Sequence, residues 1–146
     1  MKIKVQAHVA YRTQYHVVFI PKYRHKVLID GVKQYLEKVF YSILEERYED
    51  VYISEQNIQV DHVHMLIEIP PKYAVSAVIG VLKGMSSRLM RKEFEYLKRR
   101  NELWSVGYFV SSVGANEEVI RNYIKYQEKQ DRGQALLVEE KKPRAK

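Results

Sequence analysis

The chain has 146 residues, of which 46% are hydrophobic and 29% charged, a composition typical of one globular domain with a real core. Lysine and arginine number 25 against 18 acidic residues, and the net charge of +7 favours a polyanionic partner without choosing between DNA, RNA and an anionic membrane surface. The lack of cysteine excludes disulfides, thiolate metal sites and a cysteine nucleophile. No apolar run is long enough for a transmembrane helix or a signal peptide, so we expect a soluble, cytoplasmic protein.

The first predicted elements are a strand and a helix. Residues 15–20 form a β-branched and aromatic run that ends at Pro21, which predicts a strand. Asp30 is the expected N-cap of a helix, because apolar residues recur from Val32 to Leu44 at helical spacing.

A hairpin is predicted next. Residues 51–60 and 62–69 are strand-like, and the region of Asp61 leaves room only for a tight turn between them. Two prolines, Pro70 and Pro71, end the second of these strands.

The last predicted elements are a helix, a strand and a helix. Helical spacing of apolar residues over 75–89 predicts the first helix, and residues 104–113 form the predicted fourth strand. Asn116 is a good N-cap for a final helix, which is expected to end near Gln130 with Gly133 as its stop. We therefore expect one domain over residues 1–133 and a charged, flexible tail over residues 134–146.

This order of elements predicts an α+β fold of the ferredoxin-like type. The split β-α-β-β-α-β arrangement forms a four-stranded antiparallel sheet with two helices on one face, and here a C-terminal helix follows it. The other face of the sheet is then open, and function commonly sits there.

The most informative strand carries two histidines, His62 and His64. Every second residue from Val63 to Ile69 is apolar and should face the helices, so the histidines share the open face, roughly 7 Å apart at the backbone. Their imidazoles can converge on a metal from there, although a pair of surface or hydrogen-bonded histidines is an equally simple interpretation. The three other histidines have no comparable partner and are expected to be structural: His8, His16 and His25.

The final helix carries a second candidate group. Tyr123 and Gln127 are four residues apart and therefore lie one turn from each other on one face. A glutamine carbonyl can be a hard oxygen ligand, and a phenol can be a nucleophile. Tyr126 is a rival nucleophile, and packing is the alternative role for this stripe.

Basic residues supply candidate nucleic-acid contacts. Gly80 and Gly84 lie one turn apart in a predicted helix, which indicates close approach of a neighbouring helix or of a phosphodiester strand. The regions of residues 11–12 and 22–26 mix cations with aromatic residues, as proteins that follow a single strand do. The candidate DNA contacts are Lys83, Arg88, Arg12, Lys22 and Arg24.

In combination and order, five segments resemble one family. They read YHVVFIPKYRHKVL, DHVHMLIEIP, LKGMSSR, LWSVGYFVSSVG and NYIKYQ. The sequence from about residue 15 to residue 130 resembles the small single-tyrosine HUH transposases, the TnpA type of the smallest bacterial and archaeal insertion sequences.

The resemblance implies an enzyme that cleaves and rejoins single-stranded DNA. It implies that Tyr123 attacks a phosphate and keeps a 5′-phosphotyrosine link, and that His62, His64 and Gln127 bind a divalent metal ion, Mg²⁺ or Mn²⁺. It also implies a homodimer that recognises DNA hairpins at the element ends, with composite active sites and with Gly114 as a natural hinge.

Two other functions remain open from the residues alone. One is a non-catalytic ferredoxin-like nucleic-acid binder, which would form no covalent adduct. The other is a metal-dependent nuclease, whose cleavage would survive Tyr123→Phe.

Overall fold

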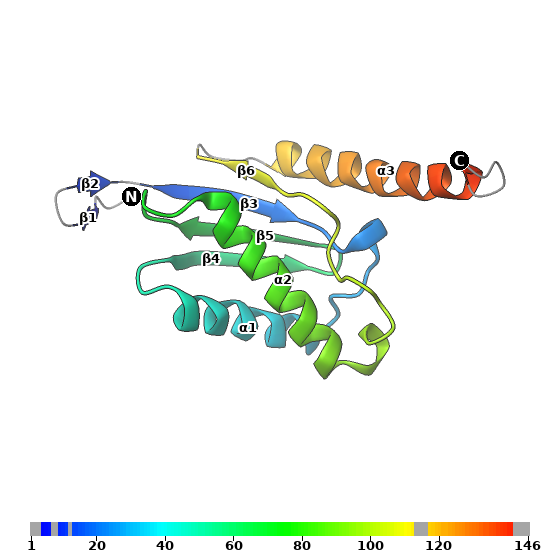
Figure 1. Cartoon of the computed structure of the whole chain (residues 1–146), viewed down its shortest axis with the longest axis horizontal. Coiled ribbons are helices and arrows are strands. Elements are labelled where there is room, and N and C mark those ends of the chain that lie inside the picture. Colours follow the sequence, from blue (N-terminus) through cyan, green and yellow to red (C-terminus); the bar gives the residue numbers. More distant parts are fainter. Residues whose placement is uncertain (1–3, 7–8, 12, 113–116, 142–146) are drawn as a thin grey trace.

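A four-stranded antiparallel sheet with helices on both sides forms the body of the chain (Figure 1). The computed structural model describes residues 4–6, 9–11, 13–112 and 117–141, with side chains over 13–112 and 117–133. The strand order is β4-β5-β3-β6, and the strands are β3 (Gln14–Phe19), β4 (Tyr52–Gln59), β5 (His62–Glu68) and β6 (Phe109–Ser111). The predicted ferredoxin-like α+β arrangement is confirmed.

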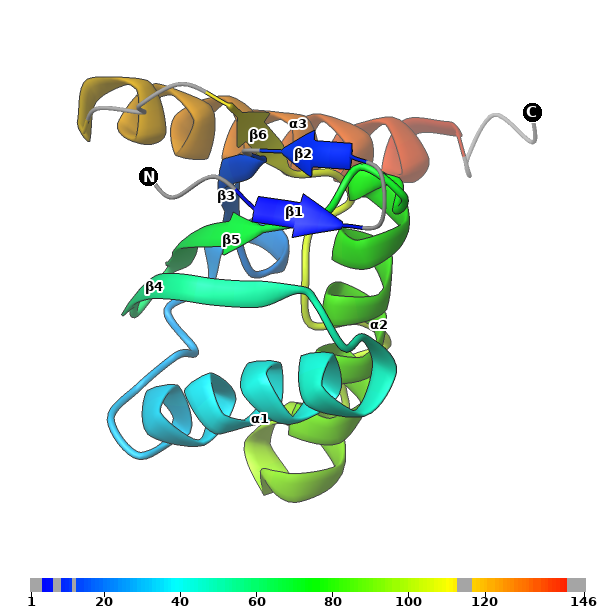
Figure 2. The same cartoon turned by 90° about the vertical axis from the view of Figure 1, so that its left-hand side faces the viewer.

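Three helices surround this sheet. They are α1 (Val32–Arg47), α2 (Val75–Glu93) and α3 (Glu117–Lys141). Figure 2 shows α1 and α2 together on one side of the sheet, with α3 on the opposite side near β3 and β6. Among the described residues, no helix is long and apolar enough to cross a membrane.

Shorter elements complete the structure. A separate two-stranded sheet pairs β1 (Lys4–Gln6) with β2 (Val9–Tyr11), and sequence analysis missed it because each strand has only three residues. Two 3₁₀ turns are η1 (Lys22–Arg24) and η2 (Glu95–Leu97). Within η1, Tyr23 and Arg24 both have a positive φ, 59° and 56°, a conformation that costs a non-glycine residue roughly 1–2 kcal/mol.

Three predicted boundaries were wrong. The fourth strand is not residues 104–113 but only Phe109–Ser111, because Gly107 at φ 97° interrupts the extended backbone after Trp104. Gly31 rather than Asp30 precedes α1, and Asp30 forms an ion pair with Lys33 instead.

The predicted end of the last helix was also wrong. The helix α3 does not stop at Gly133 but continues to Lys141, so the expected domain boundary at residue 133 falls inside a helix. Gly133 is not among the residues with a positive φ, and good helix formers such as Ala135 and Leu136 follow it. The predicted N-cap Asn116 lies outside the described residues.

The main core lies between the sheet and the helices α1 and α2. Val63, Met65 and Ile67 of β5 are at most 1% exposed, as the alternating pattern predicted. The indole of Trp104 packs edge-on against Phe19, with 4.7 Å between ring centroids. Aromatic and aliphatic side chains thus fix the helical layer under the sheet.

A second, smaller cluster positions α3 on the opposite face of the sheet. Val18 and Ile20, which alternate with the core residues of β3, pack against Ile124 of α3. Ile120 and Tyr123 border this cluster. The open face that the sequence predicted is therefore covered by α3 on the side of β3 and β6.

The buried hydrogen bond of Trp104 yields a stability prediction. Its Nε1 donates to the Oγ of Ser86 at 2.9 Å, and Ser86 is fully buried. Ser86→Ala leaves the indole N–H without this acceptor, so we expect the free energy of unfolding to fall by about 1–3 kcal/mol in urea titrations. The exposed Ser112→Ala is the control, with a change within about 0.5 kcal/mol. Equal effects of the two variants would contradict the assignment.

Candidate active site

The two predicted histidines lie on the face of β5 opposite the core. His64 is opposite Asn57 on β4 and Val18 on β3, and directly opposed residues of antiparallel strands share a face. Both histidines line a cavity of about 610 Å³ whose other wall is α3. The predicted placement of His62 and His64 on one face is confirmed.

A carboxylate orients His62. The Nδ1 of His62 lies 3.0 Å from Oδ1 of Asp61, and a carboxylate accepts, so Nδ1 carries a proton and Nε2 is the nitrogen left for a metal. Arg24 holds the other oxygen of Asp61 with an Nε–Oδ2 distance of 2.8 Å. Burial alone would raise the pKa of Asp61, but the bonds from His62 and Arg24 outweigh it and the pKa falls below its usual value. Histidines that bind a metal typically donate their other ring N–H to such a carboxylate.

His64 has a partner that sequence analysis missed. The Nε2 of His64 lies 3.1 Å from Nδ1 of His16 on β3, and the two rings stack with centroids 5.3 Å apart. Burial, followed by the nearby His16 and His62, lowers the pKa of His64, which favours the neutral imidazole that a metal requires. We expected His16 to be structural, because it has no comparable partner in the sequence. Only the register of β3 against β5 reveals this contact.

Tyr123 and Gln127 meet on α3 as their spacing predicted. The hydroxyl of Tyr123 donates to Oε1 of Gln127 at 3.4 Å, and its ring packs against Phe109. Burial, then the negative charge of Asp131, raises the pKa of Tyr123. Tyr126, the rival nucleophile, is 58% exposed.

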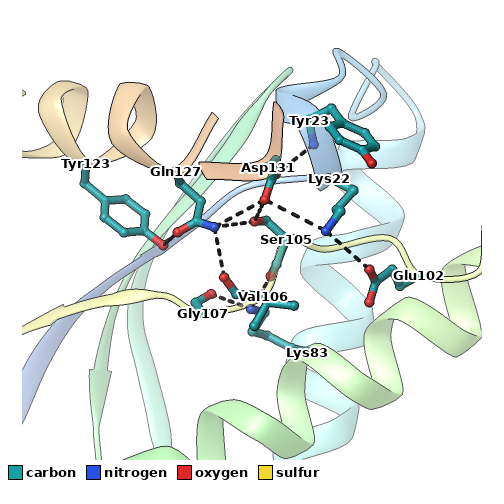
Figure 3. A network of polar contacts seen from close by, with 10 residues as sticks. All are labelled: Lys22, Tyr23, Lys83, Glu102, Ser105, Val106, Gly107, Tyr123, Gln127 and Asp131. Atoms are coloured by element: carbon teal, nitrogen blue, oxygen red, sulfur yellow. Dashed lines mark hydrogen bonds and ion pairs between the residues drawn. The ribbon is translucent and has the colours of Figure 1, made fainter. Parts of the chain in front are cut away.

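The amide of Gln127 is the centre of a buried polar network (Figure 3). Its Nε2 donates to Oγ of Ser105 at 2.6 Å and to the carbonyl oxygen of Val106 at 3.0 Å. The Ser105 hydroxyl donates in turn to Oδ1 of Asp131 at 2.7 Å. Ser105 and Asp131 are each 1% exposed, and neither was predicted, because both depend on how α3 packs against the segment before β6.

Within one chain the two candidate groups are not in one site. The α3 residues that line the histidine cavity are Glu117, Ile120, Arg121, Ile124 and Lys125. Gln127 instead contacts Ser105 and Val106. Among the residues that the structure describes, no group of three His, Asp or Glu side chains converges as a metal site would need.

The structure gives most of the predicted DNA contacts internal partners. Lys83 donates to the carbonyl oxygens of Ser105, at 2.7 Å, and of Gly107, and burial lowers the pKa of Lys83 to about 8. Lys22 pairs with Glu102 at 3.7 Å and lies 3.9 Å from Asp131.

The other predicted contacts differ from one another. Arg24 pairs with Asp61 and Glu128, whereas Arg88 is exposed on α2. Arg12 lies outside the residues with described side chains.

The two glycines of α2 face open space. A Cβ at Gly80 or Gly84 would meet no described atom within 4 Å, so no helix within the described part of the chain packs closely there. Both glycines line a cavity of about 450 Å³ between α2 and the segment before β6.

Comparison with known proteins identifies relatives along most of the chain. Over 139 residues, 92% of this chain and 90% of the relative, the sequence is 39% identical to the transposase for insertion sequence element IS200 of Salmonella typhimurium. It is 31% identical over 121 residues, 80% of this chain and 85% of the relative, to the ISDra2 transposase TnpA of Deinococcus radiodurans.

Two solved structures are also similar to this chain. A crystal structure of a protein assigned as a transposase from Deinococcus radiodurans R1 superposes with a TM-score of 0.78 at 29% identity, covering 85% of this chain and 97% of that one. A tyrosine transposase bound to a REP hairpin shares the fold, with a TM-score of 0.54 at 12% identity over 84% of this chain and 70% of that one. The family model described as "Transposase IS200 like" matches residues 9–127. The chain therefore belongs to the IS200-like family of transposases.

Proposed function

We propose that this transposase cleaves and rejoins single-stranded DNA through a covalent bond between Tyr123 and the 5′ phosphate of the cut strand. The observation that carries the proposal is the hydrogen bond from the Tyr123 hydroxyl to Oε1 of Gln127, which sets a nucleophile beside a hard oxygen ligand.

The reaction has two steps, and each step exchanges one phosphate ester bond for another. The Tyr123 oxygen bonds to phosphorus and loses its proton, while the bond from phosphorus to the 3′ oxygen breaks and that oxygen leaves as a hydroxyl. A different 3′ hydroxyl then attacks the phosphotyrosine and releases Tyr123. One phosphodiester is exchanged for another, so no nucleotide triphosphate is consumed.

The side chains around Tyr123 orient the phenol rather than deprotonate it. Burial raises the pKa of Tyr123, so the hydroxyl keeps its proton at neutral pH. Gln127 accepts the hydrogen bond from that hydroxyl but is not a base at neutral pH. Packing against Phe109 fixes the ring. The resting site thus holds an oriented but protonated nucleophile.

His62, His64 and Gln127 are the residues that would hold a divalent metal, Mg²⁺ or Mn²⁺. The histidines fit this role, because Asp61 holds Nδ1 of His62 and leaves its Nε2 to a metal, and His64 favours its neutral form. A metal bound to Nε2 of His64 would replace the contact of that nitrogen with His16. When bound, the metal would polarise the phosphate and stabilise the charge that develops on it.

We further propose a homodimer in which α3 of one chain serves the histidines of the other. The support is that Gln127 does not line the histidine cavity of its own chain. It contacts Ser105 and Val106 instead, so histidines near Gln127 would have to come from a second chain. The predicted hinge Gly114 lies outside the described residues.

The DNA partner is expected to carry hairpins at the element ends. A relative with the same fold is bound to a REP hairpin, and this chain carries a net charge of +7 that favours phosphate binding. Among the predicted contacts whose side chains the structure describes, Arg88 on α2 is the exposed one and therefore suits this role.

Covalent trapping tests the nucleophile. The protein is incubated with Mg²⁺ and labelled single-stranded DNA from the ends of its own element, then separated on a denaturing gel. We expect a protein–DNA band that EDTA abolishes, that Tyr123→Phe loses and that the matched control Tyr126→Phe keeps. Cleavage that survives Tyr123→Phe would indicate the hydrolytic nuclease instead, and binding without cleavage would indicate a binding module.

The support that Asp61 gives to His62 predicts a change in metal requirement. Asp61→Asn removes the carboxylate that fixes the imidazole tautomer, so we expect the Mg²⁺ concentration for half-maximal adduct to rise about 10–100-fold. Saturating metal should restore much of the yield, whereas His62→Ala should not recover. An unchanged Mg²⁺ requirement in Asp61→Asn would contradict this role.

Mixing two inactive variants tests the composite site. His64→Ala and Tyr123→Phe each lack one part, so a mixed dimer contains one complete site only if tyrosine and histidines come from different chains. We expect the co-refolded mixture to regain adduct formation that neither variant shows alone. No recovery despite dimers detected by light scattering would show that each chain completes its own site.

A further inference from the structure

A buried chain of hydrogen bonds holds the amide of Gln127 in one of its two possible orientations. A carboxylate accepts, so the Ser105 hydroxyl must donate its single proton to Asp131, at 2.7 Å. Ser105 can then only accept from Gln127, at 2.6 Å. The carbonyl oxygen of Val106 is a second acceptor on the same nitrogen, at 3.0 Å. The nitrogen of Gln127 therefore points inward, and Oε1 must point outward toward Tyr123.

The acceptor end of this chain is firmly anchored. Asp131 is 1% exposed, and its Oδ2 accepts from the backbone N–H of Tyr23 at 2.9 Å. The ammonium of Lys22 lies 3.9 Å from Oδ1. Both neighbours are donors, so the carboxylate oxygens keep their accepting role.

The segment that receives the Gln127 nitrogen is fixed from its other side. Lys83 of α2 donates to the carbonyl oxygens of Ser105 and Gly107, as Figure 3 shows. Gly107 lies beside the outward oxygen, because a Cβ at this residue would be 3.8 Å from Oε1 of Gln127. Glycine leaves that position without a side chain. The amide nitrogen is thus clamped while the space next to the oxygen stays clear.

We propose that Ser105 and Asp131 are positioning residues that present Oε1 of Gln127, together with the Tyr123 hydroxyl, to the metal and the DNA phosphate. This inference rests on the proposed function and adds to it the two residues that orient the ligand. It also explains why glutamine suits this position, because a carboxylate would set a negative charge against the Val106 carbonyl and Asp131. Gln127→Glu is therefore expected to weaken metal binding, although carboxylates are stronger ligands for hard cations.

The first measurement follows the amide itself by NMR of the ¹⁵N-labelled protein. The side-chain NH₂ signals of Gln127 are assigned by their loss in Gln127→Glu, and their exchange with water is measured. We expect slow exchange in the unmodified protein and at least tenfold faster exchange in Ser105→Ala and Asp131→Asn. Glu118→Gln is the matched control, because it removes an exposed carboxylate from the same helix, nine residues before Gln127.

The second measurement is binding of Mn²⁺ alone, followed by electron paramagnetic resonance. We expect affinity to fall about 10–100-fold in Ser105→Ala, Asp131→Asn and Gln127→Glu, and to stay within about twofold in Glu118→Gln. Thermal melts accompany each variant, and Ser105→Ala keeps the test valid if Asp131→Asn does not fold, because it leaves the charge of Asp131 and the contact with Tyr23 in place.

The outcomes separate the two proposals. Gln127 signals that stay protected and Mn²⁺ affinity that stays unchanged in Ser105→Ala would overturn the positioning role. So would equal losses in Glu118→Gln and Asp131→Asn, which would mean that the effect is not specific to the network around Gln127. A metal-dependent adduct in the unmodified protein together with either result would leave the proposed function intact, whereas no adduct in the unmodified protein would overturn that function instead.

Discussion

The arrangement of the candidate site depends on the alternation of side chains along β5. One set of residues is apolar and buried against α1 and α2, so the strand cannot slip by one position without exposing Val63, Met65 and Ile67. The same constraint holds His62 and His64 on the opposite face. The hydrophobic effect on one face of β5 therefore fixes the position of the two histidines on the other face.

The helix α3 carries apolar packing residues and polar site residues on different faces. Ile124 packs into the small cluster with Val18 and Ile20, which holds the helix on the sheet. Tyr123, Gln127 and Asp131 follow one another at intervals of four residues and form the polar stripe. A single helix therefore carries its own docking surface, its nucleophile, and both ends of the network that orients the amide.

Patterns within single elements could be predicted from the sequence. The alternating faces of β5 and the one-turn spacing of Tyr123 and Gln127 needed only the periods of strand and helix. The four-stranded antiparallel sheet with two helices on one face could also be predicted, because the order of elements matches a common arrangement. The short β6 could not be predicted, since the turn at Gly107 interrupts a stretch whose composition is strand-like.

Partners that come from different elements could not be predicted. His16 lies beside His64 only because of the register between β3 and β5, and nothing near residue 16 in the sequence indicates it. Ser105 and Asp131 are 26 residues apart and meet only once α3 has packed. Lys83 looked like a phosphate contact because positive charge is common in nucleic-acid binders, but the fold uses its ammonium to bind backbone carbonyls.

The left-handed backbone at Arg24 has a consequence for how the histidines of β5 are connected to the helix α3. This φ of 56° is costly for arginine, and glycine or asparagine would adopt it more easily. Only a long forked side chain, however, can reach both Asp61 beside the histidines and Glu128 on the tyrosine helix. While α3 is docked on its own chain, the charge of Arg24 is shared between these two carboxylates. The seating of the helix is thereby linked, through one guanidinium, to the carboxylate that orients His62.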